Sequence, residues 1–487
     1  MRSAILGVAV LAVCVGPAGA RSLGSLQFEP CTLTAGHAAV AVEAQCARLA
    51  VPEDHDRPDA RRIELAIAWV PAANEAEPDP VFMLAGGPGQ SARDAYPLVS
   101  AAFGEVLRKR HVILVDQRGT GGSNPLACRD EQGQSALLED PAGDSPEAAR
   151  AFARRCRAQL DADLARYTTT DAVADLEAVR VAIGAPALNL VGISYGTRVA
   201  QQYAGRHGAH VRAMVLAGVV PNTLVLGSEH AINLEAALER YFEQCRQDPG
   251  CGDRFGDPRA ALDALSRELR QAPRQVRFRD PVTGVSRAGF MSYGHLAAVV
   301  RLYAYAPQTA AMLPLSLHEA AQGRPEPLMA QAQMIVEEVG DQIMLGVQLS
   351  VMCAEDVPLL QSRPEDAGTV LGTAIIDISR WQCEDWPVRP APGDFHQPLR
   401  SDVPTLLLSG ELDPVTPPRY AEQVLEHLTR GRHLVLNGQG HGVLRVGCTP
   451  RLLARFIDTA DAAELDAACL DDLPDTPPFA GFYGWEP

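Results

Sequence analysis

Hydrophobic and polar residues alternate between residues 62 and 70, where Ile63, Leu65, Ile67 and Trp69 occupy every second position. A period of two is typical of a β-strand with one face more buried than the other. We expect this strand at or near the edge of a sheet. Continuous apolar runs follow at wide spacing, and such runs predict strands covered on both faces, as in a parallel sheet. These runs lie at residues 81–85, 111–115, 188–193 and 213–217.

Helical spacing of apolar residues appears between residues 171 and 183, and Gly184 and Pro186 are expected to end that helix. The alternation of strand and helix favours an α/β fold. From about residue 223 the pattern becomes mainly helical. Long helical stretches lie at 231–245, 258–271 and 296–322, and strand patterns return at 405–409 and 433–436. The pattern therefore predicts an α/β core that is split by an inserted helical cap.

This organisation divides the chain into four segments: a signal peptide at 1–20, the first part of the core at 21–222, the cap at 223–370 and the second part of the core at 371–487. The first segment has a positive start, an apolar run over 4–15 and small residues before a cleavage site after Ala20. We expect an exported, periplasmic or extracellular protein without a membrane anchor. A lipoprotein modified at Cys14 is the alternative, but bulky Val13 disfavours it.

The composition narrows the classes of protein that fit. With 487 residues and 47% hydrophobic content, the chain can bury one or two substantial cores. The net charge is −17 and no basic block occurs, which argues against a nucleic-acid partner or an anionic membrane surface. The oligomeric state is not readable from these features.

Ten cysteines follow the signal segment, and an even number in an oxidising compartment suggests five disulfides. The simplest hypothesis pairs each cysteine with its neighbour in the sequence. Neither a C-x-x-C nor an H-E-x-x-H motif occurs, so we expect no metal ion and no other cofactor. The predicted pairs are Cys31–Cys46, Cys128–Cys156, Cys245–Cys251, Cys353–Cys383 and Cys448–Cys469.

The sequence Gly192-Ile193-Ser194-Tyr195-Gly196 follows one of the buried strands and precedes a helical stretch through Arg206. This context is that of a nucleophile elbow, a strand-to-helix turn so tight that its flanking positions must be glycine. The turn would expose the Ser194 hydroxyl to a substrate carbonyl. The pentapeptide alone is a weak signal, and its strand and helix flanks strengthen it.

A serine nucleophile needs a base and an orienting carboxylate, which follow it in the order Ser, acid, His in this architecture. Asp413 lies just after the predicted strand at 405–409, where ligands and catalytic groups collect. His441 lies between glycines after the strand at 433–436. The sequence therefore predicts the triad Ser194, Asp413 and His441.

Two glycine-rich segments follow predicted strands. Gly86-Gly87-Pro88-Gly89 is expected to form the oxyanion hole, with the amides of Gly87 and Tyr195 as donors. The second segment begins with Asp116-Gln117-Arg118, which we interpret as a turn stabilised by an Asp116–Arg118 pair rather than as a catalytic element.

Together these motifs resemble the α/β-hydrolase superfamily, and within it the secreted tripeptidyl aminopeptidase and proline iminopeptidase branch. The similarity covers nearly the whole mature chain: G-G-P-G at 86–89, D-Q-R-G at 116–119, G-I-S-Y-G at 192–196, G-E-L-D-P-V-T-P at 410–417 and G-H-G at 440–442. The resemblance implies a serine peptidase that cuts short peptides near a free N-terminus, with a cap limiting access. Ala85 departs from the family, whose members often carry a polar residue there.

An aminopeptidase must hold the substrate ammonium, and a buried carboxylate is a natural partner. Glu355 is the leading candidate and Asp356 the second, at the point where the cap returns to the core. A salt bridge or helix-end role is the alternative for both.

The sequence thus predicts an acyl-enzyme peptidase for short peptides with a free N-terminus, and leaves open the release of one or three residues. A carboxylesterase or lipase with the same triad is the main alternative. A binding protein without catalysis is the alternative from another class.

Overall fold

The computed structural model of the chain describes residues 20–36, 40–130, 145–340 and 342–484. The predicted signal peptide, including Cys14, lies outside these residues except for Ala20. None of the described helices is both long and apolar enough to cross a membrane.

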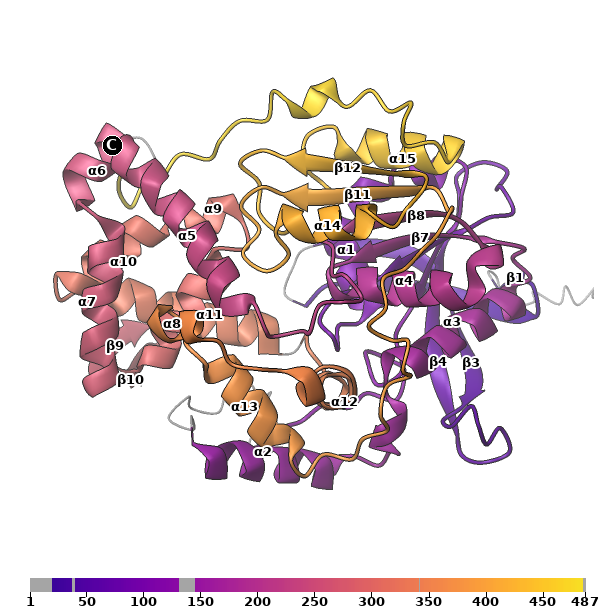
Figure 1. Cartoon of the computed structure of the whole chain (residues 1–487), viewed down its shortest axis with the longest axis horizontal. Helices are drawn as coiled ribbons and strands as arrows, with labels where there is room; N and C mark the ends of the chain where they lie inside the picture. Colours follow the sequence, from indigo (N-terminus) through magenta and orange to yellow (C-terminus); the bar gives the residue numbers. More distant parts are fainter. Residues whose placement is uncertain (1–19, 37–39, 131–144, 341, 485–487) are drawn as a thin grey trace, which may run out of the picture.

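The core is a ten-stranded sheet in the order β1-β2-β3-β4-β6-β5-β7-β8-β11-β12 (Figure 1). The first four strands pair in antiparallel fashion, and the set from β6 to β12 is parallel. The α/β fold predicted from the apolar runs is confirmed. The strands are β1 (Arg21–Leu23), β2 (Leu26–Thr34), β3 (Ala41–Pro52), β4 (Arg62–Val70), β5 (Val81–Leu84), β6 (Val112–Val115), β7 (Leu188–Ile193), β8 (Val211–Ala217), β11 (Thr405–Gly410) and β12 (Gly431–Leu436).

The prediction that residues 62–70 form an edge or near-edge strand is wrong. Three further strands, β1 to β3, lie outside β4 in the sheet. They carry many exposed polar residues, among them Glu29 and Glu43, so their sequence lacks a continuous apolar run. With β3 and β6 on its two sides, β4 is buried along most of its length.

Helices cover both faces of the sheet. One face packs with α3 and α4 in a cluster that includes Phe82, Leu190 and Tyr203. The other packs with α1 and α15 around Met83 and Phe456. Odd and even positions of the same strands serve the two clusters, as expected for strands buried on both faces. These helices are α1 (Ala92–Val99), α2 (Pro146–Gln159), α3 (Thr169–Ile183), α4 (Tyr195–His207), α14 (Pro418–Leu425) and α15 (Thr449–Thr459).

The inserted cap has a hydrophobic cluster of its own and lies to one side of the sheet (Figure 1). The predicted long helix at 296–322 is three helices, because Pro307 is the first residue of one helix and Pro314 the second residue of the next. The cap also contains an antiparallel hairpin that the sequence did not indicate. Its elements are α5 (His230–Gln247), α6 (Pro249–Phe255), α7 (Pro258–Gln271), β9 (Arg274–Arg279), β10 (Ser286–Met291), α8 (Tyr293–Tyr303), α9 (Pro307–Ala310), α10 (Leu313–Ala321) and α11 (Glu326–Gly340).

Two helices connect the cap back to the core. The buried side chains of α12 (Leu345–Glu355), such as Val347 and Val351, belong to the core cluster rather than to the cap cluster. Helix α13 (Ala374–Cys383) packs beside α2 (Figure 1). The range 223–370 predicted for the cap thus includes a helix that packs with the core.

Five disulfides join the ten cysteines of the described residues, each to its neighbour in the sequence, in the predicted pairs. In the cap, Asp248 caps α6 and brings Cys245 and Cys251 together, with a Cα–Cα distance of 5.1 Å. The C-terminal segment crosses from α15 to the cap (Figure 1), where the amide of Phe479 donates to the carbonyl of Ala311 at 2.9 Å.

Candidate active site

Ser194 lies at the turn between β7 and α4, with φ 55° and ψ −125°. A positive φ is uncommon for a residue with a side chain, and it is the geometry expected of a nucleophile elbow. The Ser194 amide donates to the carbonyl of Ala217 at 2.9 Å, which ties the elbow to the end of β8. The elbow predicted from the sequence is therefore present.

Steric contacts require glycine at both Gly192 and Gly196 of the pentapeptide. A Cβ at Gly192 would lie 2.6 Å from the carbonyl oxygen of Gly196. A Cβ at Gly196 would collide with the carbonyl oxygen of Leu84, at the end of the neighbouring strand β5. A side chain at either position would force the turn open and move Ser194.

Asp413 and His441 are brought together from the loops after β11 and β12. The Nδ1 atom of His441 lies 2.7 Å from Oδ2 of Asp413. The imidazole packs over Gly218, where a Cβ would come within 2.9 Å of Cε1. Because Gly218 follows Ala217, the backbone partner of Ser194, this packing brings the imidazole to the end of β8, next to the elbow at the end of β7.

The pKa values of Asp413 and His441 are shifted in the directions expected for an ionised carboxylate that stabilises a protonated imidazole. Burial opposes ionisation of Asp413, but the imidazole and several hydrogen bonds outweigh it and hold the pKa of the carboxyl below its usual value. Burial likewise lowers the pKa of His441, and the Asp413 carboxylate overcomes this to raise it above its usual value.

Thr416 is a site residue that the sequence reasoning missed. Its hydroxyl donates to Oδ2 of Asp413 at 2.6 Å and lies 3.1 Å from Nδ1 of His441. The amides of Val415 and Thr416 both donate to Oδ1 of Asp413 at 2.9 Å. A threonine three residues after an aspartate in a turn was the available signal.

The predicted oxyanion loop lies directly against the elbow. A Cβ at Gly86 would be 3.1 Å from Cβ of Ser194, and Gly87 has a φ of 104°. The loop is held from outside by the start of α12, because the amide of Met344 donates to the carbonyl of Gly89 at 2.9 Å. Gly87 follows Gly86 in this loop and Tyr195 follows Ser194, so each predicted donor is next in sequence to a residue of this contact.

The cap contributes residues around His441 that the sequence did not single out. The amide of His441 donates to the carbonyl of Tyr305 at 2.8 Å, and the two rings meet edge to face at 5.3 Å. Burial lowers the pKa of His230, at the start of α5, to about 3, with Arg301 and His441 adding to the effect. His230 is therefore neutral at physiological pH.

The structure places Glu355 and Asp356, the residues expected to hold a substrate ammonium, inside the protein and in contact with other side chains. Both side chains are buried, with Glu355 only 3% exposed. The Glu355 carboxyl faces Thr169, whose amide and hydroxyl each lie 2.7 Å from one of its oxygens. Both oxygens of Asp356 accept from Arg198 at 3.0 Å. Neither group is presented to a substrate, because the end of α12 packs inward.

The predicted Asp116–Arg118 pair is also wrong. Asp116 accepts from Ser91 and lies 3.5 Å from the guanidinium of Arg93, so it ties its turn to the start of α1. Arg118 is fully buried and pairs with Asp175 at 2.6 Å. The two side chains leave the turn in different directions, and both act as structural anchors.

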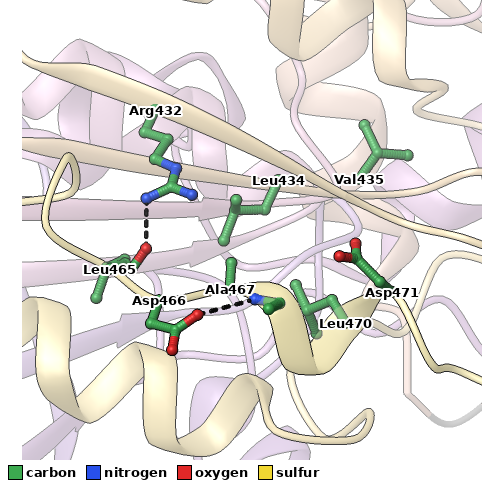
Figure 2. A pocket seen from close by; sticks show the side chains of 9 residues that line it. Arg432, Leu434, Val435, Leu465, Asp466, Ala467, Leu470 and Asp471 are labelled. Atoms are coloured by element: carbon green, nitrogen blue, oxygen red, sulfur yellow. Dashed lines mark hydrogen bonds between the residues drawn. The ribbon is translucent and has the colours of Figure 1, made fainter.

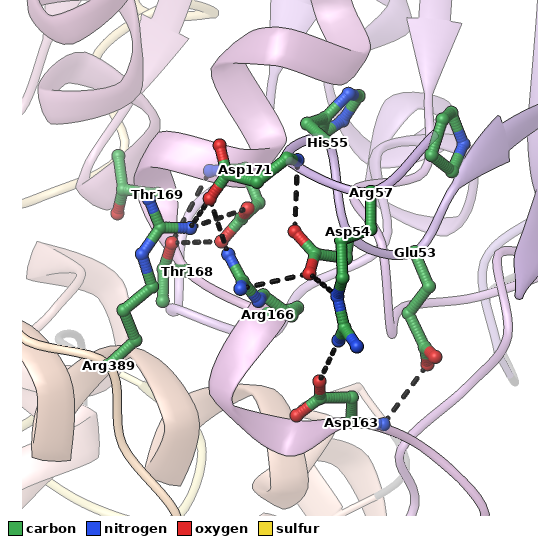
Figure 3. Close-up of polar contacts among 12 residues, drawn as sticks. Glu53, Asp54, His55, Arg57, Asp163, Arg166, Thr168, Thr169, Asp171 and Arg389 are labelled. Carbon is green, nitrogen blue, oxygen red and sulfur yellow. Dashed lines mark hydrogen bonds and ion pairs between the residues drawn. The ribbon is translucent and has the colours of Figure 1, made fainter. Parts of the chain in front are cut away.

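Arg118 belongs to a layer of charged residues behind the elbow. Near it, Arg166 pairs with Asp54 at 2.9 Å, and Thr168 caps α3 (Figure 3). Arg389 extends this layer from the segment after α13, 3.9 Å from Asp171 (Figure 3). The opposite charges in this layer pair with one another, which favours a structural role for it.

Among the described residues, one group has the spacing of metal ligands: Glu177, His207 and His210. Its carboxylate is already held by Arg180 at 2.7 Å and by the hydroxyl of Tyr203 at 2.7 Å. A guanidinium on the same carboxylate disfavours a cation there.

A surface hollow of about 370 Å³ lies beside β12 (Figure 2). Its lining comes from β12 and from residues 465–471, and includes none of the predicted site residues. Arg432, which projects into it, donates to the carbonyl of Leu465 at 2.6 Å. The hollow is separate from the candidate active site.

The sequence matches two family models that together cover most of the core. The alpha/beta hydrolase fold model matches residues 79–289, and the TAP-like protein model matches residues 369–469. The first contains the elbow, and the second contains Asp413 and His441.

The chain is also similar to curated proteins that are named as peptidases or as an esterase. The chain is 27% identical to serine protease Hip1 of Mycobacterium tuberculosis, over 91% of this chain and 92% of that protein. It is 28% identical to tripeptidyl aminopeptidase of Streptomyces lividans over 47% of this chain and 46% of that protein. It is 34% identical to carboxylesterase B of Mycobacterium tuberculosis over 43% of each chain.

The elbow, the sheet order and these matches define an enzyme of the α/β-hydrolase class. More narrowly, these matches support a TAP-like family of α/β-hydrolases, as the sequence motifs predicted.

Proposed function

We propose that this protein is a serine exopeptidase that hydrolyses short peptides near a free N-terminus, with Ser194, His441 and Asp413 as its catalytic triad. The observation that carries the proposal is the elbow at Ser194 together with the 2.7 Å contact between His441 and Asp413. The similarity to serine protease Hip1 and to tripeptidyl aminopeptidase supports peptides as the substrate class.

The reaction proceeds through an acyl-enzyme. His441 takes the proton of the Ser194 hydroxyl, and the oxygen attacks the scissile carbonyl to form a tetrahedral oxyanion that the Gly87 and Tyr195 amides bind. The C–N bond then breaks, and the imidazolium gives its proton to the leaving amine. Water, deprotonated by His441, releases the acyl fragment, and Asp413 holds the imidazole tautomer throughout.

Neither Glu355 nor Asp356 recognises the substrate ammonium in this proposal, because both are buried and already hydrogen-bonded. The preference for a free N-terminus therefore rests on the similarity to tripeptidyl aminopeptidase and on a cap that contacts His441 through Tyr305.

Mass spectrometry of the products from one peptide tests the proposal. The peptide is offered with a free and with an acetylated N-terminus to the mature protein and to Ser194→Ala. We expect cleavage of the free form only, by the wild type only, and the released mass gives the number of residues removed. Equal cleavage of both forms would overturn the exopeptidase assignment.

A carboxylesterase is the second candidate, supported by the 34% identity to carboxylesterase B over 224 residues. The buried state of Glu355 and Asp356 also favours it, since an esterase needs no ammonium ligand. Hydrolysis of a nitrophenyl ester without cleavage of either peptide would assign the protein to this class.

We also propose that the protein is exported. Five disulfides support this, because such bonds persist in oxidising compartments. Fractionation of expressing cells tests the proposal, and we expect the protein outside the cytoplasm with residues 1–20 removed.

A further inference from the structure

Helix α12 contacts the machinery around Ser194 at both of its ends. Just before the helix, Ile343 forms a β-bridge with Gln90, and the amide of Met344 donates to Gly89 at 2.9 Å. A Cβ at Gly89 would lie 2.7 Å from the carbonyl oxygen of Met344, so the two segments are in close contact. This end of α12 therefore fixes the loop that carries Gly87.

The other end of α12 reaches Tyr195 through one side chain. The Glu355 carboxyl contacts the hydroxyl of Thr169 at 2.7 Å, and that hydroxyl lies 2.6 Å from the hydroxyl of Tyr195. The amide of Thr169 donates to the second oxygen of Glu355 at 2.7 Å. Tyr195 is only 1% exposed, so this relay fixes the ring of the residue that follows the nucleophile.

The neighbouring pair of Asp356 and Arg198 holds the same helix junction. Arg198 lies one turn after Ser194 on α4, and its guanidinium contacts both oxygens of Asp356 at 3.0 Å. The amide of Leu226 donates to Asp356 at 2.8 Å. With both side chains fully buried, the end of α12 is locked to the start of α4, and Glu355 is held in register with Tyr195.

We infer that Glu355 is a positioning residue for the oxyanion hole, acting through Thr169 on Tyr195 while the start of the same helix holds the Gly87 loop. The inference rests on the proposed serine chemistry, and it replaces the ammonium-binding role expected from the sequence. It applies to ester and peptide substrates alike, because both reactions pass through a tetrahedral oxyanion.

The protonation state of Glu355 is part of this arrangement. Burial and the neighbouring carboxylate of Asp356 raise the pKa of Glu355 to about 8, against the opposing effects of Thr169 and Arg198. The charged and titratable groups around it are Asp356 on α12, Arg198 on α4 and the Tyr195 hydroxyl. His396, from the segment after α13, also contacts Glu355, with its Nε2 atom 2.7 Å from the backbone carbonyl oxygen. At neutral pH the carboxyl is mainly protonated, and it can donate to Thr169 from one oxygen and accept from its amide with the other.

Substitutions that keep or remove this pair of contacts test the inference, with kcat and KM measured on a nitrophenyl ester and on a free-amine peptide. Glu355→Gln keeps one donor and one acceptor, so its kcat is expected to remain within about threefold of wild type on both substrates. Glu355→Ala removes the relay, and kcat is expected to fall about 10- to 100-fold on both, with KM nearly unchanged, because the oxyanion donor is misplaced.

The pH dependence of kcat distinguishes a positioning role of Glu355 from a purely structural one, which would not change the shape of the pH profile. Above about pH 8 the wild type gains a negative charge two contacts from Tyr195. This charge opposes the developing oxyanion, so kcat is expected to fall on the alkaline side. Glu355→Gln cannot ionise, and its plateau is expected to extend to higher pH.

Glu53→Ala is a matched control, and Thr169→Val is a second probe. Glu53 is also a buried glutamate that accepts from a tyrosine hydroxyl, that of Tyr167 at 2.9 Å, and from a backbone amide. Its replacement is expected to lower the melting temperature and leave kcat nearly unchanged. Thr169→Val breaks the relay without removing Glu355, and is expected to lower kcat about tenfold.

The outcomes separate this inference from the proposed function. A large rise in KM for the free-amine peptide alone in Glu355→Gln, with ester hydrolysis intact, would restore the ammonium role and overturn the positioning role. Equal kcat values for wild type, Glu355→Ala and Thr169→Val would also overturn it. If the wild type cleaves esters but no peptide, the exopeptidase proposal fails, and the ester measurements still decide the role of Glu355.

Discussion

The ten-stranded sheet packs a hydrophobic cluster on each of its faces, and the helical cap has a cluster of its own. The two regions supply the candidate active site with different kinds of group. Ser194, Asp413 and His441 all follow parallel strands of the sheet, namely β7, β11 and β12. The cap supplies Tyr305, whose ring and carbonyl contact His441, and places Arg301 near His230.

This difference has a physical origin. The carboxyl ends of neighbouring parallel strands meet at one edge of a sheet, so chemistry distributed along the sequence converges there. The cap has no such shared edge, and its helices pack by local apolar contacts around residues such as Leu238 and Phe242. We therefore expect changes in the sheet loops to affect catalysis directly, and changes in the cap to affect which substrates are accepted.

Among changes in the sheet loops, Asp413→Asn is expected to cause the largest loss of catalytic activity. An asparagine keeps the shape but favours the wrong imidazole tautomer, so kcat should fall about 10⁴-fold. The melting temperature should change much less. Steady-state kinetics on the ester and the peptide check this, and a loss below about tenfold on both would contradict the proposed role of Asp413.

Phe242→Ala tests the cap side. Phe242 is fully buried in the cap cluster, and its removal should cost about 3–5 kcal/mol of stability in that region. We expect peptide hydrolysis to fall more than hydrolysis of a small ester, because the elbow and the Asp413–His441 contact lie outside the cap cluster. Phe82→Ala in the sheet cluster is the matched control, and it should reduce both activities together.

The fall of kcat/KM at acidic pH tests the contact between Asp413, after β11, and His441, after β12. Since Asp413 raises the pKa of His441 above its usual value, the neutral base is lost as the pH falls through that raised pKa. The value of kcat/KM should therefore drop about tenfold per pH unit below it. In Asp413→Asn the residual activity should show its acidic limb at lower pH, and an unmoved limb would contradict the assignment of His441 as the base.

The smallest expected difference between the regions is in the free energy of unfolding that is lost when one disulfide is removed. Cys245–Cys251 closes a loop of only 6 residues in the cap, whereas Cys353–Cys383 closes 30 residues and ties α12 to α13. Loop-closure entropy predicts a loss of about 2 kcal/mol for the first and about 4 kcal/mol for the second. Denaturant unfolding of the double-serine variants measures both, and a larger loss for the cap disulfide would contradict this ranking.

Much of the sheet was predictable because its inner strands are continuous apolar runs, as at Val81–Leu84 and Leu188–Ile193. The three outer strands were missed because they face solvent on one side and carry polar residues there. The division of one predicted cap helix into three followed from Pro307 and Pro314, whose effect the apolar periodicity had hidden.

The sequence by itself determined the elbow, the acid and histidine loops and the order of the cysteine pairs. These features depend on local rules: glycines that permit a tight turn at Ser194, and strand ends that carry Asp413 and His441. Only the tertiary structure decided the contacts of Glu355, Asp356 and Thr416. A carboxylate binds whatever cation or donor the fold brings to it, and here Thr169 and Arg198 come from helices more than 150 residues away in the sequence.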